Sequence, residues 1–301
     1  MDELRVDAGV LVFPGLGSPF VGMASPAGEG MGEVWRKVSG PVGVNVHQAC
    51  LEGPASLLKR EEISQAALLA HGYGVVSTLG RFPRVAMGYS VGGYTLLAAF
   101  GIWSLEQAQA AFAISQHHLS RVIPPGRGDL MGVLGLPLPE VLDLCQRGDL
   151  HLAAINGPLH TLVGGEIAAL EEEIPHLRKR GALSVRRLGL AFPYHTALLK
   201  RAVVGLKRDI PPPGRAWADL PLWCGGSGPP TRSGVELVET LADQLATPLL
   251  WWPRLCEVAG QGGERVIDAG PGRFLSRLAR SLPVKILSWE QATSPGLEAL
   301  E

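Results

Sequence analysis

The sequence predicts an α/β protein in which a large domain with a mainly parallel sheet carries a smaller inserted subdomain. A short apolar segment runs into Gly-x-Ser-x-Gly around Ser90 and then into a small-residue helix, which is typical of the strand-to-helix turn called a nucleophile elbow. Before this turn, a strand and helical segments follow one another in the order of a parallel sheet. From 124 to 190 the order is instead strand, helix, strand, strand, helix, strand, which is typical of a ferredoxin-like fold.

The first strand is expected at 9–13, where an apolar run ends in a loop rich in Gly and Pro. A helix is expected to begin at Ile63 with Ser64 as its cap, and to lead to the strand of the elbow. A second helix after the elbow should cover 105–122. At the carboxyl ends of such parallel strands, functional groups are expected to gather.

A Pro-Gly-rich break at 123–128 marks the start of the insert. We therefore expect a hydrolase-like domain of 1–123 and 191–301, with a ferredoxin-like subdomain of 124–190 inserted in it. The elements expected in the insert are strands at 130–136, 150–155, 160–164 and 183–190 and helices at 138–146 and 166–180. After the insert, a strand at 220–224, a helix at 235–245 and a strand at 265–268 should complete the large domain.

Composition limits the possible functions. The chain has 301 residues, of which 46% are hydrophobic and 18% charged, as in a globular protein with a well-buried core. The net charge of -1 argues against a general nucleic-acid or membrane-surface binder, which needs a basic excess. No apolar run reaches the ~20 residues that span a bilayer, and the acidic start does not suit a secretory signal. A cytoplasmic location is expected.

The cysteines also indicate a cytoplasmic protein. Cys50, Cys145, Cys224 and Cys256 lie far apart, without a Cys-x-x-Cys pair or histidines at metal-ligand spacing. They are expected to be reduced, buried, apolar residues, and no metal site is expected.

Ser90 is the candidate nucleophile. Gly88 and Gly92 allow the strand to approach the helix closely, and the helix start behind the serine offers free N–H groups to a developing oxyanion. A serine nucleophile needs a base within hydrogen-bond reach. Among eight histidines, His195 stands out because it follows a Phe-Pro-Tyr segment where the chain returns from the insert. A lone histidine is nevertheless more often structural, so this assignment depends on further motifs.

Those motifs occur in order along nearly the whole chain, and together they resemble the malonyl-CoA:acyl carrier protein transacylases and the acyltransferase domains of polyketide synthases. They are Phe13-Pro14-Gly15-Leu16-Gly17-Ser18, Ile63-Ser64-Gln65, Gly88-Tyr89-Ser90-Val91-Gly92, Asn156-Gly157-Pro158, Pro193-Tyr194-His195, Gln244-Leu245-Ala246-Thr247-Pro248 and Asp268-Ala269-Gly270-Pro271-Gly272.

The resemblance implies a Ser–His dyad. Ser90 would attack an acyl thioester, and His195 would take its proton. The backbone carbonyl of Gln244 and the side chain of Asn156 would orient the histidine. An acyl-enzyme formed in this way implies ping-pong kinetics.

The resemblance also implies the surroundings of the reaction. The backbone N–H groups of Leu16 and Val91 would form the oxyanion hole. The partners would be an acyl carrier protein and an acyl-CoA or acyl-carrier thioester, in fatty acid or polyketide biosynthesis. No bound cofactor is expected, since the phosphopantetheine arm belongs to the carrier or to CoA.

One departure from the family pattern concerns the substrate. In extender-unit transferases an arginine on the helix after the elbow pairs with the free carboxylate of the malonyl group. Here Ser115 occupies that position, and the next arginine is Arg121. An unpaired buried carboxylate costs several kcal/mol. A malonyl-type acyl group is therefore not expected, unless Arg121 reaches back from a different face of the helix.

The acyl pocket is expected to contain Tyr89, Ser115, Phe192 and Gln65. Leu16 replaces the usual glutamine of the first loop, Tyr89 replaces the usual histidine, and Phe192 occupies the substrate-sorting position ahead of the base. Leu16 and Phe192 would make the pocket less polar; neutral drift is the alternative explanation of each change.

A basic cluster on the insert is a candidate docking surface for an acidic carrier protein. It contains Arg178, Lys179, Arg180, Arg186 and Arg187. A solvated helix end is the commoner explanation of such a run.

Three alternatives stay open. The same dyad would serve a hydrolase that removes acyl groups from carrier proteins, or an ordinary malonyl transacylase. A catalytically silent, carrier-binding scaffold is the third, and the intact Ser90 and His195 argue against it.

Overall fold

The computed structural model describes residues 9–23, 30–79, 82–147, 149–260, 265–280 and 283–292. Its centre is a six-stranded sheet in the order β10-β9-β1-β2-β7-β8. The pairs β10–β9, β9–β1, β1–β2 and β2–β7 are parallel, whereas β8 is antiparallel to β7. The strands are β1 (Val10–Phe13), β2 (Val85–Gly88), β7 (Trp217–Trp223), β8 (Thr231–Ser233), β9 (Val266–Asp268) and β10 (Ile286–Ser288).

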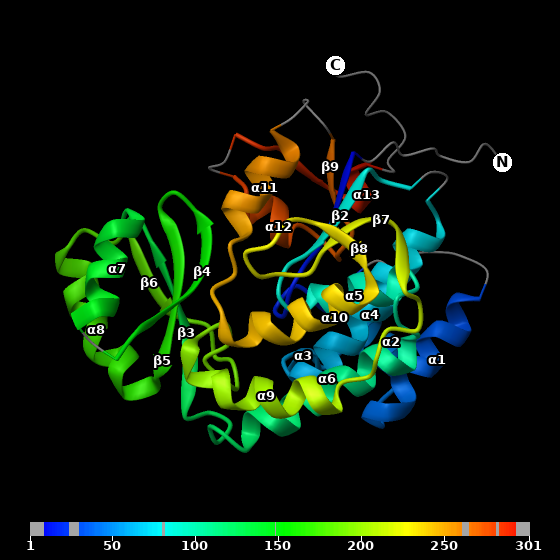
Figure 1. The fold of residues 1–301 in the computed structure, drawn as a ribbon, viewed down its shortest axis with the longest axis horizontal. Coiled ribbons are helices and arrows are strands. Elements are labelled where there is room, and N and C mark those ends of the chain that lie inside the picture. Colours follow the sequence, from blue (N-terminus) through cyan, green and yellow to red (C-terminus); the bar gives the residue numbers. More distant parts are fainter. Residues whose placement is uncertain are drawn as a thin grey trace.

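Helices cover this sheet (Figure 1). The inner strands β1 and β2 are buried along their whole length, so they read as continuous apolar runs, as expected of a parallel sheet covered on both faces. The helices are α1 (Met31–Val42), α2 (Val46–Glu52), α3 (Ala55–Leu58), α4 (Glu61–Ser77), α5 (Gly92–Ala99), α6 (Leu105–Ser120), α9 (Lys200–Asp209), α10 (Gly234–Asp243), α11 (Trp251–Ala259), α12 (Phe274–Leu278) and α13 (Trp289–Ala292).

A second, antiparallel sheet lies to one side of the first, on the left in Figure 1. Its order is β4-β5-β3-β6, with two helices on one face and a hydrophobic core of its own. The elements are β3 (Gly128–Leu134), α7 (Leu138–Arg147), β4 (His151–Gly157), β5 (His160–Glu166), α8 (Ile167–Lys179) and β6 (Ser184–Arg187). The expected fold class, a parallel-sheet α/β domain with a separate ferredoxin-like sheet, is confirmed. All of these elements lie within 124–190.

The antiparallel sheet contacts the large domain through backbone hydrogen bonds of β4. Ile155 of β4 donates to the carbonyl of Leu249, and Leu249 donates to Ala153, at 3.0 and 2.9 Å. The chain leaves β6 and returns to the large sheet through 188–196, which contains the histidine expected to act as the base. This segment is held to β3 by the bond from the Leu188 N–H to the Leu130 carbonyl, at 2.8 Å, and to the large domain by the bond from the His195 N–H to the Leu245 carbonyl, at 2.9 Å.

Two local expectations are wrong. Ser64 does not cap a helix, because α4 begins at Glu61 and Ser64 lies buried inside it. Glu61 and Glu62 occupy its first turn, where acidic side chains interact favourably with the helix dipole. Cys50 and Cys224 are buried, but Cys145 and Cys256 are partly exposed, so the expectation of four buried thiols holds for only two.

The described residues contain no helix long and apolar enough to cross a membrane. Within the same ranges, no group of three or more His, Cys, Asp or Glu side chains is placed to hold a metal ion.

Candidate active site

Ser90 lies on the turn between β2 and α5, with its backbone in the left-handed region at φ 55°. A non-glycine residue rarely adopts this conformation, and such strain is concentrated at functional sites. The flanking glycines explain how the turn fits: a Cβ at Gly88 would lie 2.5 Å from the Gly93 nitrogen, and a Cβ at Gly92 would lie 2.3 Å from the Phe13 carbonyl. The sequence therefore folds here as a nucleophile elbow.

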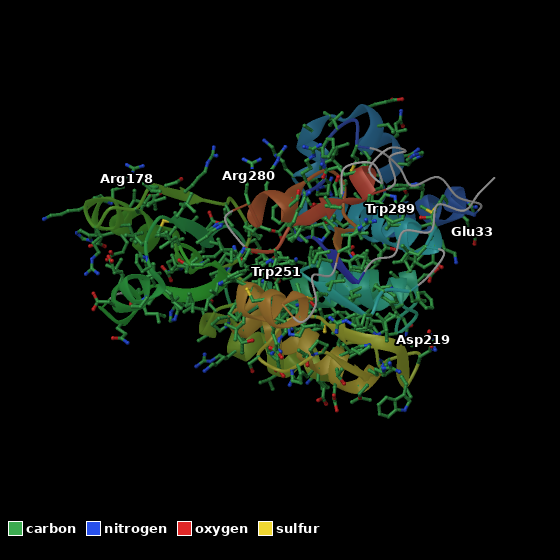
Figure 2. All side chains as sticks on the ribbon, turned by 90° about the horizontal axis from the view of Figure 1, so that it is seen from above. Glu33, Arg178, Asp219, Trp251, Arg280 and Trp289 are labelled. Atoms are coloured by element: carbon green, nitrogen blue, oxygen red, sulfur yellow. The ribbon has the colours of Figure 1, made fainter. Side chains whose placement is uncertain are left out.

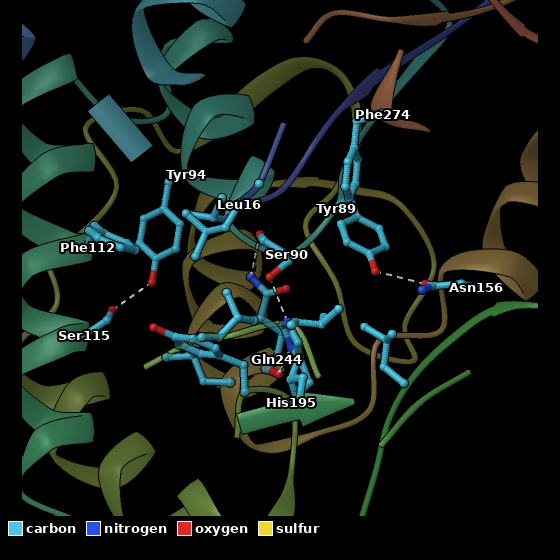
Figure 3. Close-up of a pocket in the computed structure, with 18 of the residues that line it drawn as sticks. Leu16, Tyr89, Ser90, Tyr94, Phe112, Ser115, Asn156, His195, Gln244 and Phe274 are labelled. Atoms are coloured by element: carbon cyan, nitrogen blue, oxygen red, sulfur yellow. Dashed lines mark hydrogen bonds between the residues drawn. The ribbon is translucent and has the colours of Figure 1, made fainter. Parts of the chain in front are cut away.

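His195 lies directly opposite Ser90 (Figure 3). Its Nε2 is 2.8 Å from Ser90 Oγ, and its Nδ1 is 2.7 Å from the carbonyl oxygen of Gln244. Because a carbonyl only accepts hydrogen bonds, Nδ1 carries the proton and Nε2 is left to accept from the serine hydroxyl. The backbone of His195 is also left-handed, at φ 63°, and its N–H donates to the Leu245 carbonyl.

The electrostatic setting keeps this imidazole neutral. Burial lowers the pKa of His195 to about 4, and the hydrogen bond to the Gln244 carbonyl opposes only part of that shift. A neutral imidazole with a free Nε2 is the form that can take a proton from Ser90. The pair can therefore act as nucleophile and base at neutral pH.

Two backbone N–H groups lie beside the nucleophile. Val91 caps α5, so its N–H precedes the helical ladder, and Leu16 lies in the turn after β1. Neither N–H donates to another described residue. Both residues line the same cavity as Ser90, which is the arrangement an oxyanion hole requires.

The predicted role of Asn156 needs correction. Its Oδ1 accepts a hydrogen bond of 3.0 Å from the Tyr89 hydroxyl, and within the described ranges it makes no hydrogen bond to His195. Gln244 instead contributes twice, because its side-chain Nε2 also donates to the Ser90 carbonyl at 3.2 Å. Asn156 thus ties β4 to the residue before the nucleophile and does not hold the base.

A cavity of about 300 Å³ opens at Ser90 and His195, and its walls are mainly apolar (Figure 3). Of the residues expected in the acyl pocket, Tyr89 and Ser115 line it. The remaining walls come from helices of the large domain, strands β3 and β5 of the antiparallel sheet, and connecting segments: Tyr94, Phe112, Gln116, Leu119, Leu130, His160, Leu162, Leu188, Leu190, Tyr194, Leu245, Phe274 and Leu278. No lysine or arginine is among the lining residues that the structure describes.

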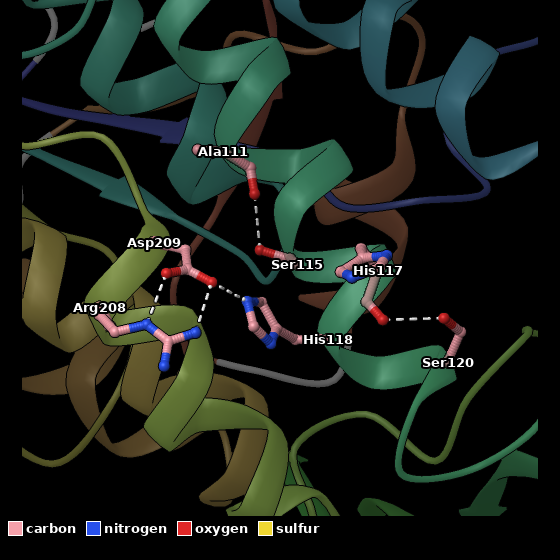
Figure 4. Close-up of polar contacts among 7 residues, drawn as sticks. All are labelled: Ala111, Ser115, His117, His118, Ser120, Arg208 and Asp209. Carbon is pink, nitrogen blue, oxygen red and sulfur yellow. Dashed lines mark hydrogen bonds and ion pairs between the residues drawn. The ribbon is translucent and has the colours of Figure 1, made fainter.

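Ser115 is buried in this wall, and its hydroxyl both donates and accepts a hydrogen bond. It donates to the Ala111 carbonyl at 2.7 Å, so the Tyr94 hydroxyl, also at 2.7 Å, donates to Ser115 (Figures 3 and 4). Arg121 caps the end of α6, is exposed and does not line the cavity. The position where the family pattern has an arginine is thus occupied by a neutral pair of hydroxyls.

Phe192 and Gln65 are placed elsewhere than expected. They line a second, larger hollow of about 1550 Å³, which shares Leu16, Gln116 and Leu190 with the first cavity. Gln65 is buried, and its Nε2 has no hydrogen-bond partner among the described residues. Both residues therefore adjoin the acyl cavity but are not part of its wall.

Several polar residues of the site were not predicted. Glu61 is partly buried in the second hollow and accepts hydrogen bonds from the Tyr194 hydroxyl and from the Ala191 N–H, the latter at 2.8 Å. Gln116 donates to Tyr194 at 2.9 Å. Tyr194 is in a motif beside the base and Gln116 is next to Ser115, so both could have been found by adjacency. Nothing local in the sequence singles out Glu61.

The predicted basic cluster is divided by ion pairs. Arg187 binds Asp129 and Glu171, and Arg180 binds Asp143. The remaining side chains, those of Arg178, Lys179 and Arg186, are exposed, and Arg178 lies at the outer edge of the insert (Figure 2). Because Arg186 alternates in β6 with the buried Val185, it points to the face of the sheet away from α7 and α8. The five residues do not form one continuous free surface.

The chain is similar to known transacylases over most of its length. It is 26% identical to the malonyl CoA-acyl carrier protein transacylase of Bacillus subtilis over 282 residues, which cover 90% of this chain and 89% of the relative. The solved structure of the Coxiella burnetii malonyl CoA-acyl carrier protein transacylase matches with a TM-score of 0.86 at 22% identity, covering 95% of each chain. The corresponding structure from Xanthomonas oryzae matches with a TM-score of 0.80 at 27% identity, covering 93% of each chain.

A further match is a malonyl-transacylase in complex with a type II polyketide synthase acyl-carrier protein, with a TM-score of 0.81 at 23% identity, covering 93% of this chain and 94% of that one. No protein-family model matches the sequence. The resemblance expected from the motifs is confirmed by these relatives.

Proposed function

We propose that this chain, a relative of the malonyl CoA-acyl carrier protein transacylases, is an acyltransferase that moves an acyl group from a CoA or carrier thioester to an acyl carrier protein through an ester on Ser90. The observation that carries the proposal is the 2.8 Å contact between Ser90 Oγ and an unprotonated His195 Nε2 at the mouth of an apolar cavity. We place the reaction in fatty acid or polyketide synthesis, since one neighbour is a malonyl-transacylase bound to a type II polyketide synthase acyl-carrier protein.

In the first half-reaction, Ser90 Oγ forms a bond to the thioester carbonyl carbon while its proton passes to His195 Nε2. The carbonyl oxygen becomes an oxyanion within reach of the Leu16 and Val91 N–H groups. When the tetrahedral intermediate collapses, the C–S bond breaks and its electron pair leaves with sulfur, which takes the proton from His195. The second half-reaction reverses these steps with the thiol of the acceptor carrier, and Ser90 recovers its proton.

The same proposal has a finer part, which is that the acyl group lacks a free carboxylate. It is supported by the hydroxyl pair of Tyr94 and Ser115 at the arginine position and by the absence of lysine and arginine from the described cavity wall. A charge buried without a partner costs several kcal/mol. The names of the relatives favour the other candidate, an ordinary malonyl transacylase.

Two structural assignments complete the proposal. The catalytic domain is formed by 1–123 and 191–301 and the ferredoxin-like subdomain by 124–190, with the active site between them. The carrier docks near the free part of the basic cluster, Arg178 and Lys179, which have no ion-pair partner among the described residues. Reversing the charge of Arg178 should then raise the KM for the carrier and leave acylation by a CoA thioester unchanged.

The decisive experiment is incubation with acyl-CoA thioesters followed by intact-mass measurement. An adduct on the wild-type protein that is absent from Ser90→Ala supports the acyl-enzyme, whereas an undiminished adduct on the variant contradicts it. Transfer to an added carrier supports the transferase, and rapid release as free acid without a carrier identifies a hydrolase. A tenfold or greater preference for malonyl over butanoyl in kcat/KM, about 1.4 kcal/mol, would identify an ordinary malonyl transacylase.

A further inference from the structure

A partly buried polar network lies where the acyl cavity meets the second hollow. Tyr194 and Gln116 line the cavity, and Gln116 and Glu61 line the hollow. The Tyr194 hydroxyl donates to the Glu61 carboxylate, and Gln116 Nε2 donates to Tyr194 at 2.9 Å and to Glu61 at 3.3 Å. The backbone N–H of Ala191 completes the ring of donors around the carboxylate.

The hydroxyl groups of the cavity wall at this place already donate their hydrogens to protein acceptors. Tyr94 gives its hydroxyl hydrogen to Ser115, Ser115 gives its own to the Ala111 carbonyl, and Tyr194 gives its own to Glu61. Each hydroxyl oxygen keeps a lone pair. Gln116 Oε1 lies 3.2 Å from the Tyr194 hydroxyl, but the single hydrogen of that hydroxyl goes to Glu61, so Oε1 remains an acceptor. The part of the cavity wall formed by Tyr94, Ser115, Gln116 and Tyr194 therefore offers hydrogen-bond acceptors to a bound acyl group. An arginine at this place would instead offer N–H donors.

The charge behind this wall also favours a cationic group over an anionic one. Burial raises the pKa of the Glu61 carboxyl, with the hydrogen bonds from Tyr194, Ala191 and Gln116 opposing the shift. A buried carboxylate that is destabilised by burial gains from a nearby cation and is repelled by a second carboxylate. The unpartnered Gln65 Nε2 in the second hollow is a neutral donor and supplies no charge.

The cationic side chains that line the second hollow do not neutralise the charge of the Glu61 carboxylate. Lys59 and Arg60 line that hollow but are exposed, where solvent screens their charge. Arg60 is also engaged with Glu62, its Nε lying 2.8 Å from a Glu62 carboxylate oxygen. The polar end of the cavity thus offers free acceptors, and the Glu61 carboxylate lies behind it on the side of the second hollow.

We propose, on the basis of the acyltransferase function above, that Glu61 and Gln116 select acyl groups whose far end carries a protonated amine. The resemblance places the partner of a malonyl carboxylate at position 115, so the far end of a three-carbon acyl group comes next to Ser115 and Gln116. An ammonium there donates to Gln116 Oε1 and interacts with the Glu61 carboxylate behind it. The apolar walls hold the methylene groups.

The test compares 3-aminopropanoyl, butanoyl and malonyl thioesters by kcat/KM for acylation of Ser90. The first two have the same number of heavy atoms in the chain and differ only in the terminal ammonium or methyl. We expect 3-aminopropanoyl to be preferred over butanoyl by about 10- to 100-fold, as for a hydrogen bond to a charged group. Malonyl should be the poorest of the three.

Glu61→Gln should abolish this preference, measured within the variant as the ratio of kcat/KM for 3-aminopropanoyl over butanoyl. The matched control is Glu62→Gln, which removes the same charge one residue away and should keep the preference. If Glu61→Gln loses butanoyl acylation as well, Gln116→Leu replaces it in the test, because that variant leaves the contacts of Glu61 with Ala191 and Tyr194 in place. Loss of the preference in that variant supports the proposal, and its persistence overturns it.

The outcomes separate this proposal from the one on which it rests. Acylation by butanoyl without any preference for 3-aminopropanoyl overturns the role of Glu61 and leaves the acyltransferase function standing. A preference that survives in Glu61→Gln also overturns it. No adduct from any of the three thioesters contradicts the acyltransferase function itself.

Discussion

Replacing Ser115 by arginine should make the cavity accept carboxylate-bearing acyl groups. Ser115 is 2% exposed and lies in the cavity wall, so a guanidinium there would meet a carboxylate in a place with little water. A hydrogen bond to a charged group contributes about 1.5–3 kcal/mol, and about 1.4 kcal/mol changes a rate ratio tenfold. The ratio of kcat/KM for malonyl over butanoyl should therefore rise roughly 10- to 100-fold.

The substitution also carries a structural cost. It removes the hydroxyl that joins Tyr94 to the Ala111 carbonyl and adds volume to a packed wall, which typically destabilises a protein by about 1–3 kcal/mol. Urea unfolding measures this cost independently of activity. Ser115→Ala is the matched control, since it removes the hydroxyl without adding charge and should leave the malonyl-to-butanoyl ratio unchanged.

Acylation of each variant is followed by release of the CoA thiol and by intact mass. The Glu61 carboxylate can pair with the new guanidinium, so Glu61→Gln combined with Ser115→Arg should raise the malonyl ratio further than Ser115→Arg alone. A folded Ser115→Arg protein whose ratio equals that of the wild type would refute the reasoning. So would a wild-type protein that already prefers malonyl tenfold.

Four further predictions concern the dyad and its support. Because the pKa of His195 is lowered to about 4 and only the neutral form accepts a proton, kcat/KM for acylation should fall near pH 4, and an acid limb near the unperturbed value of about 6.5 contradicts this. The same shift removes stability as the pH falls from about 6.5 to about 4, since the unfolded state binds the proton first, and urea titrations across that range should show it. Gly92→Ala should cost about 3 kcal/mol or more of unfolding free energy, whereas Gly32→Ala, with open space around its Cβ, should cost nothing or stabilise by up to about 1 kcal/mol. Tyr89→Phe and Asn156→Ala should each cost about 1 kcal/mol, and the double variant should cost less than their sum if the hydrogen bond couples them; additive losses in urea unfolding would argue against that coupling.

Much of the fold could be predicted because its signals are local. The elbow depends on a five-residue pattern in which Gly88 and Gly92 are required by close contacts, and the elements of the insert follow short apolar runs and turn residues. The strands β8 and β10 have only three residues each and were not predicted. They form by pairing with the edges of β7 and β9. This pairing depends on the tertiary structure and leaves no pattern in the local sequence.

The candidate site likewise contains residues that local motifs predict and residues that only the tertiary structure brings together. Ser90, His195 and the Gln244 carbonyl are placed by motifs, and the structure brings them within hydrogen-bond distance. Asn156 was assigned the wrong contact because Tyr89 stands where the family has histidine, and its hydroxyl donates to the amide oxygen. Glu61 could not be found from the sequence, since its role depends on a chain segment about 130 residues away.

The dyad and the acyl pocket are held by different kinds of interaction, and this explains how specificity can change while the chemistry is kept. His195 is fixed through its own backbone N–H to Leu245 and through Nδ1 to a backbone carbonyl, and Ser90 is fixed by a glycine-flanked turn. The one cavity-wall side chain among these restraints is that of Gln244, whose Nε2 donates to the Ser90 carbonyl at 3.2 Å; no side chain of α6 takes part in them. The wall residues Ser115 and Gln116 lie on α6, so substitutions there alter the charge and polarity of the pocket without moving the nucleophile or the base. An inverted wall, with acceptors where the family pattern has a guanidinium, is therefore compatible with an intact acyl-transfer dyad.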